Sequence, residues 1–460
     1  MRTHPPLLVL GFLLTSCGTD GPIGPLLNDS GFDVFVTEVS NIKPLLFGLN
    51  VTVDPGAKVV VEYWTTGEPR LRVESDSGVN HELLLSRLLP LAGYDYEVQL
   101  VLRDTTLVAH SGSFVTDALP TDLDDIVLTS TGESTSPLTM LELRVPTFQG
   151  FAAVDSKGRV VWYHRTSGSS WGWTRRANGN FVFLDTGGGL NEVTPTGGIV
   201  ATLPNANAEV IHHDVIATPQ NTLYFMSRHP QSVNGTTWTG EIIWEWNPDT
   251  DELTARWNAF DFLSPDTDTT ARSRTDDWLH GNSLHIGPSG NVLLSSPWLN
   301  QVIAITGDFS AIAWRLGGKN ATITTDAASV FDFQHSAAEL SIGRVLVFDN
   351  RGADDAGVPY SRALELDLNF TNNTATTAWS FRAPNGNYAS IISSARRMAN
   401  GNTMVEFGPS DGWRGSIGPV EVYEVQQDGT IVWNLVVDGP NHMYRATPFN
   451  DIAGEVEVGN

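Results

Sequence analysis

Short runs in which apolar and polar residues alternate fill the chain from about residue 31 onward, separated by turns rich in glycine, asparagine and proline. Alternation with a period of two places every second side chain on the same face of an extended strand. Stretches with apolar residues every three to four positions, which would indicate helices, are scarce. The pattern therefore predicts an all-β protein.

Residues 31–118 contain seven such runs, among them "FDVFVTEVS", "HELLLSRL" and "YDYEVQLVLRD". Short strands of this number with turns between them are typical of an antiparallel sandwich. The segment "LPLAGYDYEVQLVL" resembles the leucine, proline and tyrosine pattern of fibronectin type III-like domains. We therefore expect a small Ig/fibronectin type III-like β-sandwich over 31–118, with "LPTDLDD" as its boundary.

Two turn-and-strand motifs alternate from about residue 120. One is a turn followed by an apolar strand that ends in tryptophan, as in "VDSKGRVVWYH" and "VQQDGTIVWNL", with a degenerate copy in "VTPTGGIVATL". The other is a Gly/Asn turn before an apolar strand, as in "RANGNFVFLD". The first motif recurs six times at spacings of roughly 40–60 residues, a period typical of β-propellers. We expect a six-bladed propeller over 119–460, closed by pairing of residues 138–145 with the last inner strand.

Polar side chains recur at one position of this repeat. His213, Asn282, His335 and His442 each lie six residues before the Pro or Ser that opens a turn. His280 lies two residues before Asn282 and is expected on the same face of a strand. Since equivalent positions of a radial repeat converge near its axis, the register predicts a polar site there. By the same alternation, His212 should face away from it.

The charge balance and the cysteine count limit the function. The chain has 27 basic and 52 acidic residues, a formal net charge of -25, which argues against nucleic-acid binding. A single cysteine, Cys17, rules out an intrachain disulfide. No segment is apolar enough to span a bilayer.

Cys17 ends an apolar run, "LLVLGFLLTSC", that is typical of a signal peptide. The last four residues of the run resemble the lipobox of bacterial lipoproteins, in which the cysteine becomes the acylated N-terminus. We expect a lipoprotein signal peptide at 1–17, a linker at 18–30 and a protein exported to the periplasmic face of the outer membrane or the cell surface. Its contact with the membrane would be the N-terminal lipid alone. An ordinary cleaved signal peptide is the alternative.

Several motifs occur in an order that resembles the bacterial arylsulfate sulfotransferases. They are "HHD", "DDWLHGNSLHI", "QHSAAEL" followed by "VLVFDN", "SRALELDL" followed by "AWSF", and "YRATPF". The resemblance covers nearly the whole chain after residue 17. It implies a six-bladed propeller behind an Ig-like domain. It also implies ping-pong transfer of a sulfuryl group from a phenolic sulfate ester to a phenol, without an adenosine-phosphosulfate (PAPS) cofactor.

The resemblance also implies roles for individual residues. His335 in the "QH" element would be the nucleophile that carries the sulfuryl group. His280 and Asn282 would hold the sulfuryl oxygens, with His280 also acting as acid and base. The "HHD" element supplies a third histidine, which the register argument identifies as His213. A neutral imidazole is both a good nucleophile and a good leaving group, as this relay requires.

The chain departs from the family at one position. The resemblance places an arginine on the strand after the "DDWLHGN" element, where this chain has Pro297 or Trp298 in "LLSSPWLN". An arginine there would clamp the sulfate with paired hydrogen bonds. Arg228, Arg351 and Arg445 are the candidate substitutes, and Arg228 is favoured. Two further expected substrate contacts, His442 and Tyr444, lie near the end of the chain.

Three alternatives remain open at this stage. The propeller is a non-catalytic module that binds sulfated aromatics or acts as a scaffold, an interpretation that the missing arginine favours. Or it is a metal-dependent hydrolase or lactonase, because propellers of this size host such chemistry and imidazoles bind transition metals. Or the polar side chains only satisfy one another in a channel. Our preferred interpretation takes no metal and no cofactor. The expected partners are a small aryl sulfate donor and a phenol acceptor, and the sandwich is a candidate homodimer surface.

Overall fold

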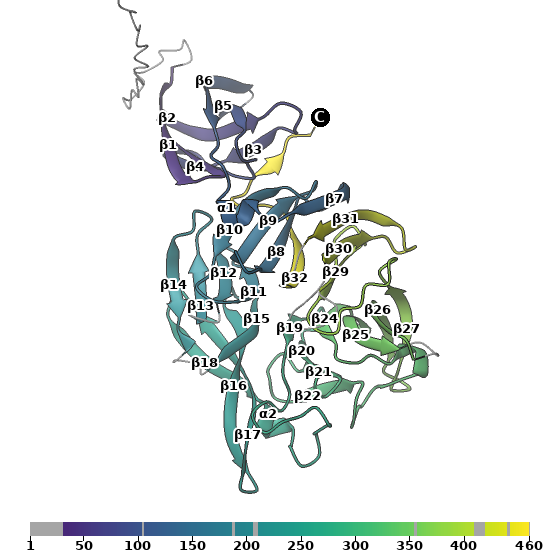
Figure 1. Ribbon diagram of the computed structural model, residues 1–460. Helices are drawn as coiled ribbons and strands as arrows, with labels where there is room; N and C mark the ends of the chain where they lie inside the picture. Colours follow the sequence, from purple (N-terminus) through teal and green to yellow (C-terminus); the bar gives the residue numbers. More distant parts are fainter. Residues whose placement is uncertain are drawn as a thin grey trace, which may run out of the picture.

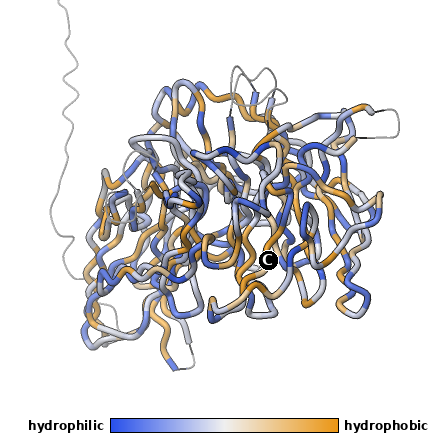
Figure 2. The backbone as a smooth tube through the Cα atoms, turned by 90° about the horizontal axis from the view of Figure 1, so that it is seen from below, coloured by the Kyte–Doolittle hydropathy of each residue, from blue (hydrophilic) through white to orange (hydrophobic). Residues whose placement is uncertain are grey.

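The computed structural model of the chain describes residues 31–103, 105–185, 189–205, 210–353, 357–408, 419–438 and 442–459. The predicted signal peptide, Cys17 and the linker at 18–30 lie outside these residues, so the lipid anchor and the localisation stay predictions. Among the described residues, no helix combines the length and the apolar character needed to cross a membrane. The described chain is almost entirely β-structure, with short apolar and polar stretches alternating along it (Figure 2).

The N-terminal unit is one antiparallel sheet that curls around its own core. The long strand β2 pairs with β1 and β4 through its first half and with β3 and β5 through its second half. Its side chains alternate inward, so that Leu49, Val53 and Val61 are fully buried. The prediction of an antiparallel β-unit ahead of the propeller is confirmed. It is a single curled sheet in which the long strand β2 pairs with strands on both halves. The strands are β1 (Asp33–Lys43), β2 (Leu46–Trp64), β3 (Leu71–Glu74), β4 (Gly78–Leu85), β5 (Gly93–Leu102) and β6 (Thr105–Val115).

Six further sheets form the blades of a propeller below this unit (Figure 1). Blade 1 comprises β11 (Ser170–Arg175), β12 (Phe181–Asp185), β13 (Gly189–Val193) and β14 (Ile199–Leu203). Blade 2 comprises β15 (Ile211–Ala217), β16 (Leu223–Val233), β17 (Thr236–Asn247) and β18 (Glu252–Asn258). Blade 3 comprises β19 (Ser283–Ile286), β20 (Val292–Ser296), β21 (Gln301–Ile305) and β22 (Ile312–Leu316).

Blades 4 and 5 each have a fifth strand. Blade 4 comprises β24 (His335–Ser341), β25 (Arg344–Ala353), β26 (Pro359–Asn369) and β27 (Thr374–Phe381), with β23 (Thr324–Thr325) outside them. Blade 5 comprises β28 (Ser394–Arg397), β29 (Thr403–Phe407), β30 (Val420–Val425) and β31 (Ile431–Val437), with β7 (Leu128–Gly132) at its outer edge. The six-bladed propeller predicted from the repeated motifs is confirmed.

Blade 6 closes the ring with strands from both ends of the propeller sequence. Its inner strand β32 (His442–Phe449) pairs with β8 (Leu138–Arg144), which continues into β9 (Gln149–Asp155) and β10 (Val160–Arg165). This is the closure expected from residues 138–145. The last short strand, β33 (Val456–Glu457), then leaves the propeller and pairs with β3 of the N-terminal sheet.

The repeated tryptophans lie on the fourth strand of their blades. Trp162, Trp257, Trp314, Trp379 and Trp433 belong to β10, β18, β22, β27 and β31, and the degenerate copy is β14. Trp433 is fully buried, and its indole N–H donates to the Ser130 hydroxyl of β7 at 2.9 Å. The tryptophan motif therefore fixes the outer strands of the blades.

Helices are few and short in the described chain. They are α1 (Thr121–Asp124) between the N-terminal sheet and the propeller, α2 (Ala259–Phe262) after blade 2, and the 3-10 turn η2 (Ala327–Ser329). Helix α2 begins the long connection to blade 3, which lies beside the extended β16–β17 hairpin (Figure 1). That connection ends at the residues that precede β19.

Candidate active site

The inner strands of four blades lose their regular register where they pass the axis. An extra residue in one strand of an antiparallel pair forms a β-bulge, which re-aims the side chains on either side of it. The irregular positions are Trp171 in β11, His213 and Asp214 in β15, Ser336 and Ala337 in β24, and Tyr444 and Arg445 in β32. His213 and Ser336 also have positive φ, at 62° and 55°. Inward-facing residues at the axis therefore do not follow strict alternation.

A cavity of about 340 Å³ lies at these bulges. Four of its lining side chains are histidines, and most of the others are apolar or aromatic. The lining comprises Trp171, Val210, Ile211, His212, His213, Arg228, His280, Phe333, His335, Ile391, Ile392 and Tyr444. Such a cavity is large enough for a single aromatic ring with its substituents. The structure thus brings the three sequence-predicted histidines, Arg228 and Tyr444 into one pocket.

His335 has a fixed tautomer. The Asn350 amide nitrogen donates to the carbonyl oxygens of Ala389 and Ile392 at 2.7 and 2.8 Å, so its oxygen must act as an acceptor. That oxygen lies 2.7 Å from His335 Nδ1, and the Phe333 carbonyl lies 3.2 Å from the same nitrogen. His335 Nδ1 therefore carries the proton, which leaves the lone pair on Nε2.

His280 is paired with a buried carboxylate. Its Nδ1 lies 2.6 Å from the Asp277 carboxylate, to which it donates. Burial alone raises the pKa of Asp277, but the hydrogen bond and charge of His280, with the nearby Arg228, leave that pKa below its usual range. The side chain of His280 is 23% exposed, so its Nε2 end remains accessible from the pocket. A histidine held by a carboxylate in this way is suited to give and take a proton.

His213 belongs to a chain of hydrogen bonds that continues through His212 to Glu241. Its Nδ1 lies 2.7 Å from His212 Nδ1, and His212 Nε2 lies 2.8 Å from the Glu241 carboxylate. The other Glu241 oxygen accepts from the Gly281 N–H at 2.9 Å. His212 lines the pocket together with His213, although alternation predicted that it would face away. The bulge at His213 and Asp214 is the physical reason for this difference.

Burial keeps two of the imidazoles neutral. The pKa of His335 falls to about 3, mainly because burial disfavours the charged ring, with the Asn350 hydrogen bond acting in the opposite sense. Burial, followed by the charges of His280 and His212, lowers the pKa of His213 well below its usual range. Only a neutral imidazole has a lone pair for nucleophilic attack, so the site holds His335 in its reactive form.

The candidate arginines lie in different places. Arg228 lines the pocket, with its guanidinium 3.6 Å from the Asp277 carboxylate. Arg351 lies behind the lining residue Phe333, over its ring at 3.8 Å, and donates from Nε to the Ser390 carbonyl. Arg445 is buried beneath the pocket and is bound to Asp214 at 2.6 Å. Of the three, Arg228 is therefore the one in contact with the cavity.

Asn282 does not line the pocket but forms hydrogen bonds with residues next to the lining. Its side-chain amide donates to the Gln334 carbonyl at 2.8 Å, and its backbone carbonyl accepts from the Tyr444 hydroxyl and from Arg445. The expectation that Asn282 and His280 share one strand face does not hold, because β19 begins only at Ser283 and His280 has a φ of 54°. His442 lies at the start of β32, opposite Arg144 and outside the lining residues.

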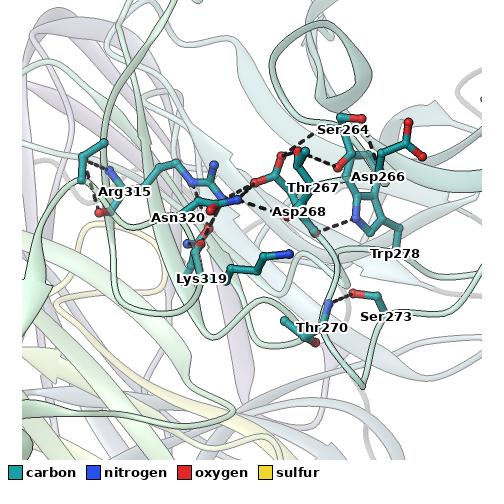
Figure 3. Close-up of polar contacts among 12 residues, drawn as sticks. Ser264, Asp266, Thr267, Asp268, Thr270, Ser273, Trp278, Arg315, Lys319 and Asn320 are labelled. Carbon is teal, nitrogen blue, oxygen red and sulfur yellow. Dashed lines mark hydrogen bonds and ion pairs between the residues drawn. The ribbon is translucent and has the colours of Figure 1, made fainter.

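The connection that carries Asp277 and His280 is anchored to blade 3 through Asp268 (Figure 3). The Asp268 carboxylate accepts from Arg315 at 2.8 Å and from Asn320 at 3.1 Å. Its backbone carbonyl accepts from the indole N–H of Trp278, which is fully buried. These contacts fix the loop that carries His280 to blade 3.

Two supporting residues were not identified from the sequence as site residues. Asn350 is the last residue of the "VLVFDN" segment within β25, and Glu241 lies in β17, directly before the apolar residues 242–244. The polar Asn after five apolar or acidic strand residues is a signal that could have identified Asn350. Within the described part of the chain, no three His, Cys, Asp or Glu side chains are grouped as a bound metal ion would require.

Comparison with known proteins adds a family and a set of distant folds. A family model described as "Arylsulfotransferase (ASST)" matches residues 124–444, and a search of curated proteins finds no match. A catalytically inactive virginiamycin B lyase from Staphylococcus aureus, solved with quinupristin, is 10% identical, with 68% of this chain and 100% of that chain covered and a TM-score of 0.37. The periplasmic gluconolactonase of Pseudomonas aeruginosa is also 10% identical, with 66% and 97% covered and a TM-score of 0.38. At such low identities and TM-scores, these likenesses say nothing about chemistry.

Proposed function

The chain belongs to the arylsulfotransferase family, and from this premise we propose that it transfers the sulfuryl group of an aryl sulfate ester to a phenol through a sulfurylated His335. The observation that carries the proposal is the fixed tautomer of His335. Its Nδ1–H is committed to Asn350, so Nε2 is a neutral nucleophile at the pocket. No PAPS cofactor has a role in this reaction.

In the first half-reaction, His335 Nε2 attacks the sulfur atom of the donor. The N–S bond forms while the bond between sulfur and the aryl oxygen breaks, and protonated His280 gives its proton to the departing phenolate. The donor anion and the imidazolium of His280 become a neutral phenol and a neutral His280. The sulfurylated ring of His335 keeps its Nδ1–H, and the Asn350 oxygen that accepts from it stabilises the positive charge on that ring.

The second half-reaction reverses these steps with another phenol. The acceptor oxygen attacks sulfur, His280 Nε2 takes the phenolic proton, and the N–S bond to His335 breaks. His335 returns to its neutral tautomer, and His280 is again protonated. His280 is therefore neutral between the two halves and protonated between turnovers, when the Asp277 carboxylate at 2.6 Å holds the charged form in place.

Two further groups would receive the charge on the sulfuryl oxygens. Arg228 supplies a permanent positive charge at the pocket. In the proposed form, His212 donates from Nε2 to the Glu241 carboxylate and from Nδ1 to His213 Nδ1. The anionic sulfuryl group favours this form. His213 then presents Nε2–H to a sulfuryl oxygen. Fixed donors of this kind account for a large part of catalysis by charge stabilisation.

Intact-protein mass spectrometry tests the covalent step. Brief mixing of the protein with 4-nitrophenyl sulfate, without an acceptor, should add the mass of one SO₃ group, and peptide mapping should place it on His335. Addition of phenol should remove it. The His335→Asn variant should acquire no adduct, because it lacks the nucleophile, whereas His110→Asn in the N-terminal sheet should behave like the wild type.

The outcome also separates the competing functions. An adduct on another residue would move the nucleophile away from His335. No adduct and no release of phenol over a panel of aryl sulfates would contradict the transferase and favour a propeller that binds sulfated aromatics without turning them over. In that case, binding of the same sulfates should still be measurable by calorimetry and should weaken in Arg228→Gln.

A further inference from the structure

Trp298 is in direct contact with His280. It lies in the turn between β20 and β21, and its indole ring is parallel to the His280 imidazole, with 4.9 Å between the ring centres and 4° between the planes. The side chain is largely buried, at 9% exposure. The Trp298 carbonyl accepts from the Thr270 hydroxyl at 2.5 Å, and the Arg274 guanidinium lies 4.5 Å from the centre of the indole ring. The stack is thus held from the loop before His280 as well as from blade 3.

We propose that Trp298 is a positioning residue of the acid–base step, whose ring face holds the His280 imidazole toward the pocket and favours its protonated form. The inference rests on the proposed function, because it concerns the proton that the departing phenolate receives. The face of an aromatic ring is negative, and a cation over an indole is stabilised most when water is excluded. Trp298 is outside the pocket lining, so it acts through His280.

The other charged groups around His280 act in both directions. The Asp277 carboxylate, at 2.6 Å, favours the protonated ring, and Glu241 lies close by through its bond to the Gly281 N–H. Arg228 opposes it, since it competes for Asp277 from 3.6 Å. His213 meets His280 edge to face, with 4.8 Å between the ring centres.

Arg274 is a second cation that opposes the protonated ring, whereas the two neighbouring imidazoles do not. Burial keeps His213 and His335 neutral, so neither repels a proton on His280 at neutral pH. Arg274 lies over Trp298 and is 3.8 Å from Asp277, so part of its charge is compensated by that carboxylate and by Asp276.

The contribution of Trp298 should depend on the leaving group. A phenolate as basic as a tyrosine side chain, with a pKa of about 10, needs a proton as it leaves. 4-Nitrophenolate is far less basic and needs little help. Loss of the ring face should therefore slow the donors with basic leaving groups selectively, whereas a general distortion of the pocket would slow all donors alike.

The test measures sulfurylation rates for phenyl sulfate and 4-nitrophenyl sulfate in Trp298→Leu, Trp298→Phe and Trp379→Leu, across a range of pH. In Trp298→Leu we expect the rate with phenyl sulfate to fall by about 3- to 10-fold more than the rate with 4-nitrophenyl sulfate, as for the loss of one cation–π contact. The alkaline limb of the phenyl sulfate profile should move to lower pH. Trp298→Phe keeps a ring face and should recover most of the difference, and Trp379→Leu in β27 should keep the wild-type ratio.

Each result decides the inference. An equal loss for both donors in Trp298→Leu, with an unchanged pH profile, would reduce Trp298 to a packing residue. Failure of Trp298→Phe to recover the ratio would show that the ring face has no special role. A wild-type protein that releases phenol from neither donor would instead overturn the proposed function, so the two failures are distinguishable.

Discussion

Asn350 decides which nitrogen of His335 carries a proton. A neutral imidazole can place its hydrogen on either nitrogen, and only one choice leaves a lone pair at the pocket. Asn350 makes that choice because both hydrogens of its amide are already bound to backbone carbonyls. In the proposed mechanism, the reactivity of His335 is therefore set by Asn350.

Asn350→Ala should lower the rate of His335 sulfurylation by about 10- to 100-fold, the usual cost of losing a group that orients a reactive histidine. It should also destabilise the fold by about 1–3 kcal/mol, since it leaves buried carbonyls without donors. Stopped-flow release of 4-nitrophenol and urea denaturation measure the two effects. Asn372→Ala, in an exposed turn, is the control, and an unchanged rate in Asn350→Ala would show that His335 does not depend on this contact.

The sequence located the three histidines that the structure brings into one pocket, but not their surroundings. His213 and His335 share a position in the repeat, and His280 lies two residues before Asn282, which holds the same position. His212 was placed on the wrong face, since a bulge shifts alternation by a residue and leaves little trace in composition. Asn350 and Glu241 act through contacts with another strand of the same blade, which spacing along the sequence does not reveal.

At the scale of elements, buried carboxylates clamp the Gly/Asn turns. In blade 1, Glu192 of β13 accepts from the side-chain amides of Asn178 and Asn180 at 2.9 and 2.7 Å. In blade 5, Glu424 of β30 accepts from Asn402 at 2.5 Å. The recurring asparagines of these turns thus have a structural role, which the sequence showed only as turn chemistry.

Glu424 also joins two blades. Its oxygens accept from the Ser134 hydroxyl, the Thr135 N–H and the Thr135 hydroxyl, which lie on the segment that leads into blade 6. Glu424→Gln replaces one acceptor with a donor that faces other donors, and we expect a loss of about 1–3 kcal/mol in the free energy of unfolding. Urea denaturation measures it, with the exposed Glu252→Gln as control. Equal stability of the two variants would contradict a joining role.

At the scale of the whole molecule, buried ionisable side chains gather on the first two strands of blades 5 and 6. Glu142 and Glu406 are buried there, with Arg396 and Arg445 nearby, and neither Glu406 oxygen has a hydrogen-bond partner among the described residues. Burial raises the pKa of Glu142 to about 8, and burial together with Glu142 raises that of Glu406 well above its usual range. Glu142 and Glu406 therefore retain protons at pH values where they would lose them in an unfolded chain.

This retention predicts how stability varies with pH. Between the ordinary pKa of 4.5 and about 8, Glu142 holds a proton in the folded state but not in the unfolded state, so its contribution to stability falls as pH rises. Glu142→Gln removes this dependence and should gain stability relative to the wild type between pH 5 and 8, by an amount on the order of a few kcal/mol. Thermal unfolding at pH 5, 6.5 and 8 measures the difference. A constant difference would mean that Glu142 is ionised throughout.

The overall architecture was the most predictable level. Six copies of a tryptophan motif predicted six blades, and the apolar run at 138–145 predicted how the ring closes. The return of the chain to the N-terminal sheet was not foreseen, because β33 has only two residues and no periodicity to detect. A propeller can be predicted from its sequence because its motifs repeat. The pairing of β33 occurs once, so no second copy of its sequence pattern reveals it.

The closure of blade 6 has a consequence for how the protein is made. Strands β8, β9 and β10 emerge early in synthesis, but β32 emerges only after the other five blades. Until then the inner edge of β8 is an unpaired strand in a nascent chain, a site for misassembly with other chains. Tyr444 lies on that last strand, so the pocket is completed in the final step. A chain released before β32 would have neither a closed ring nor a complete reaction site.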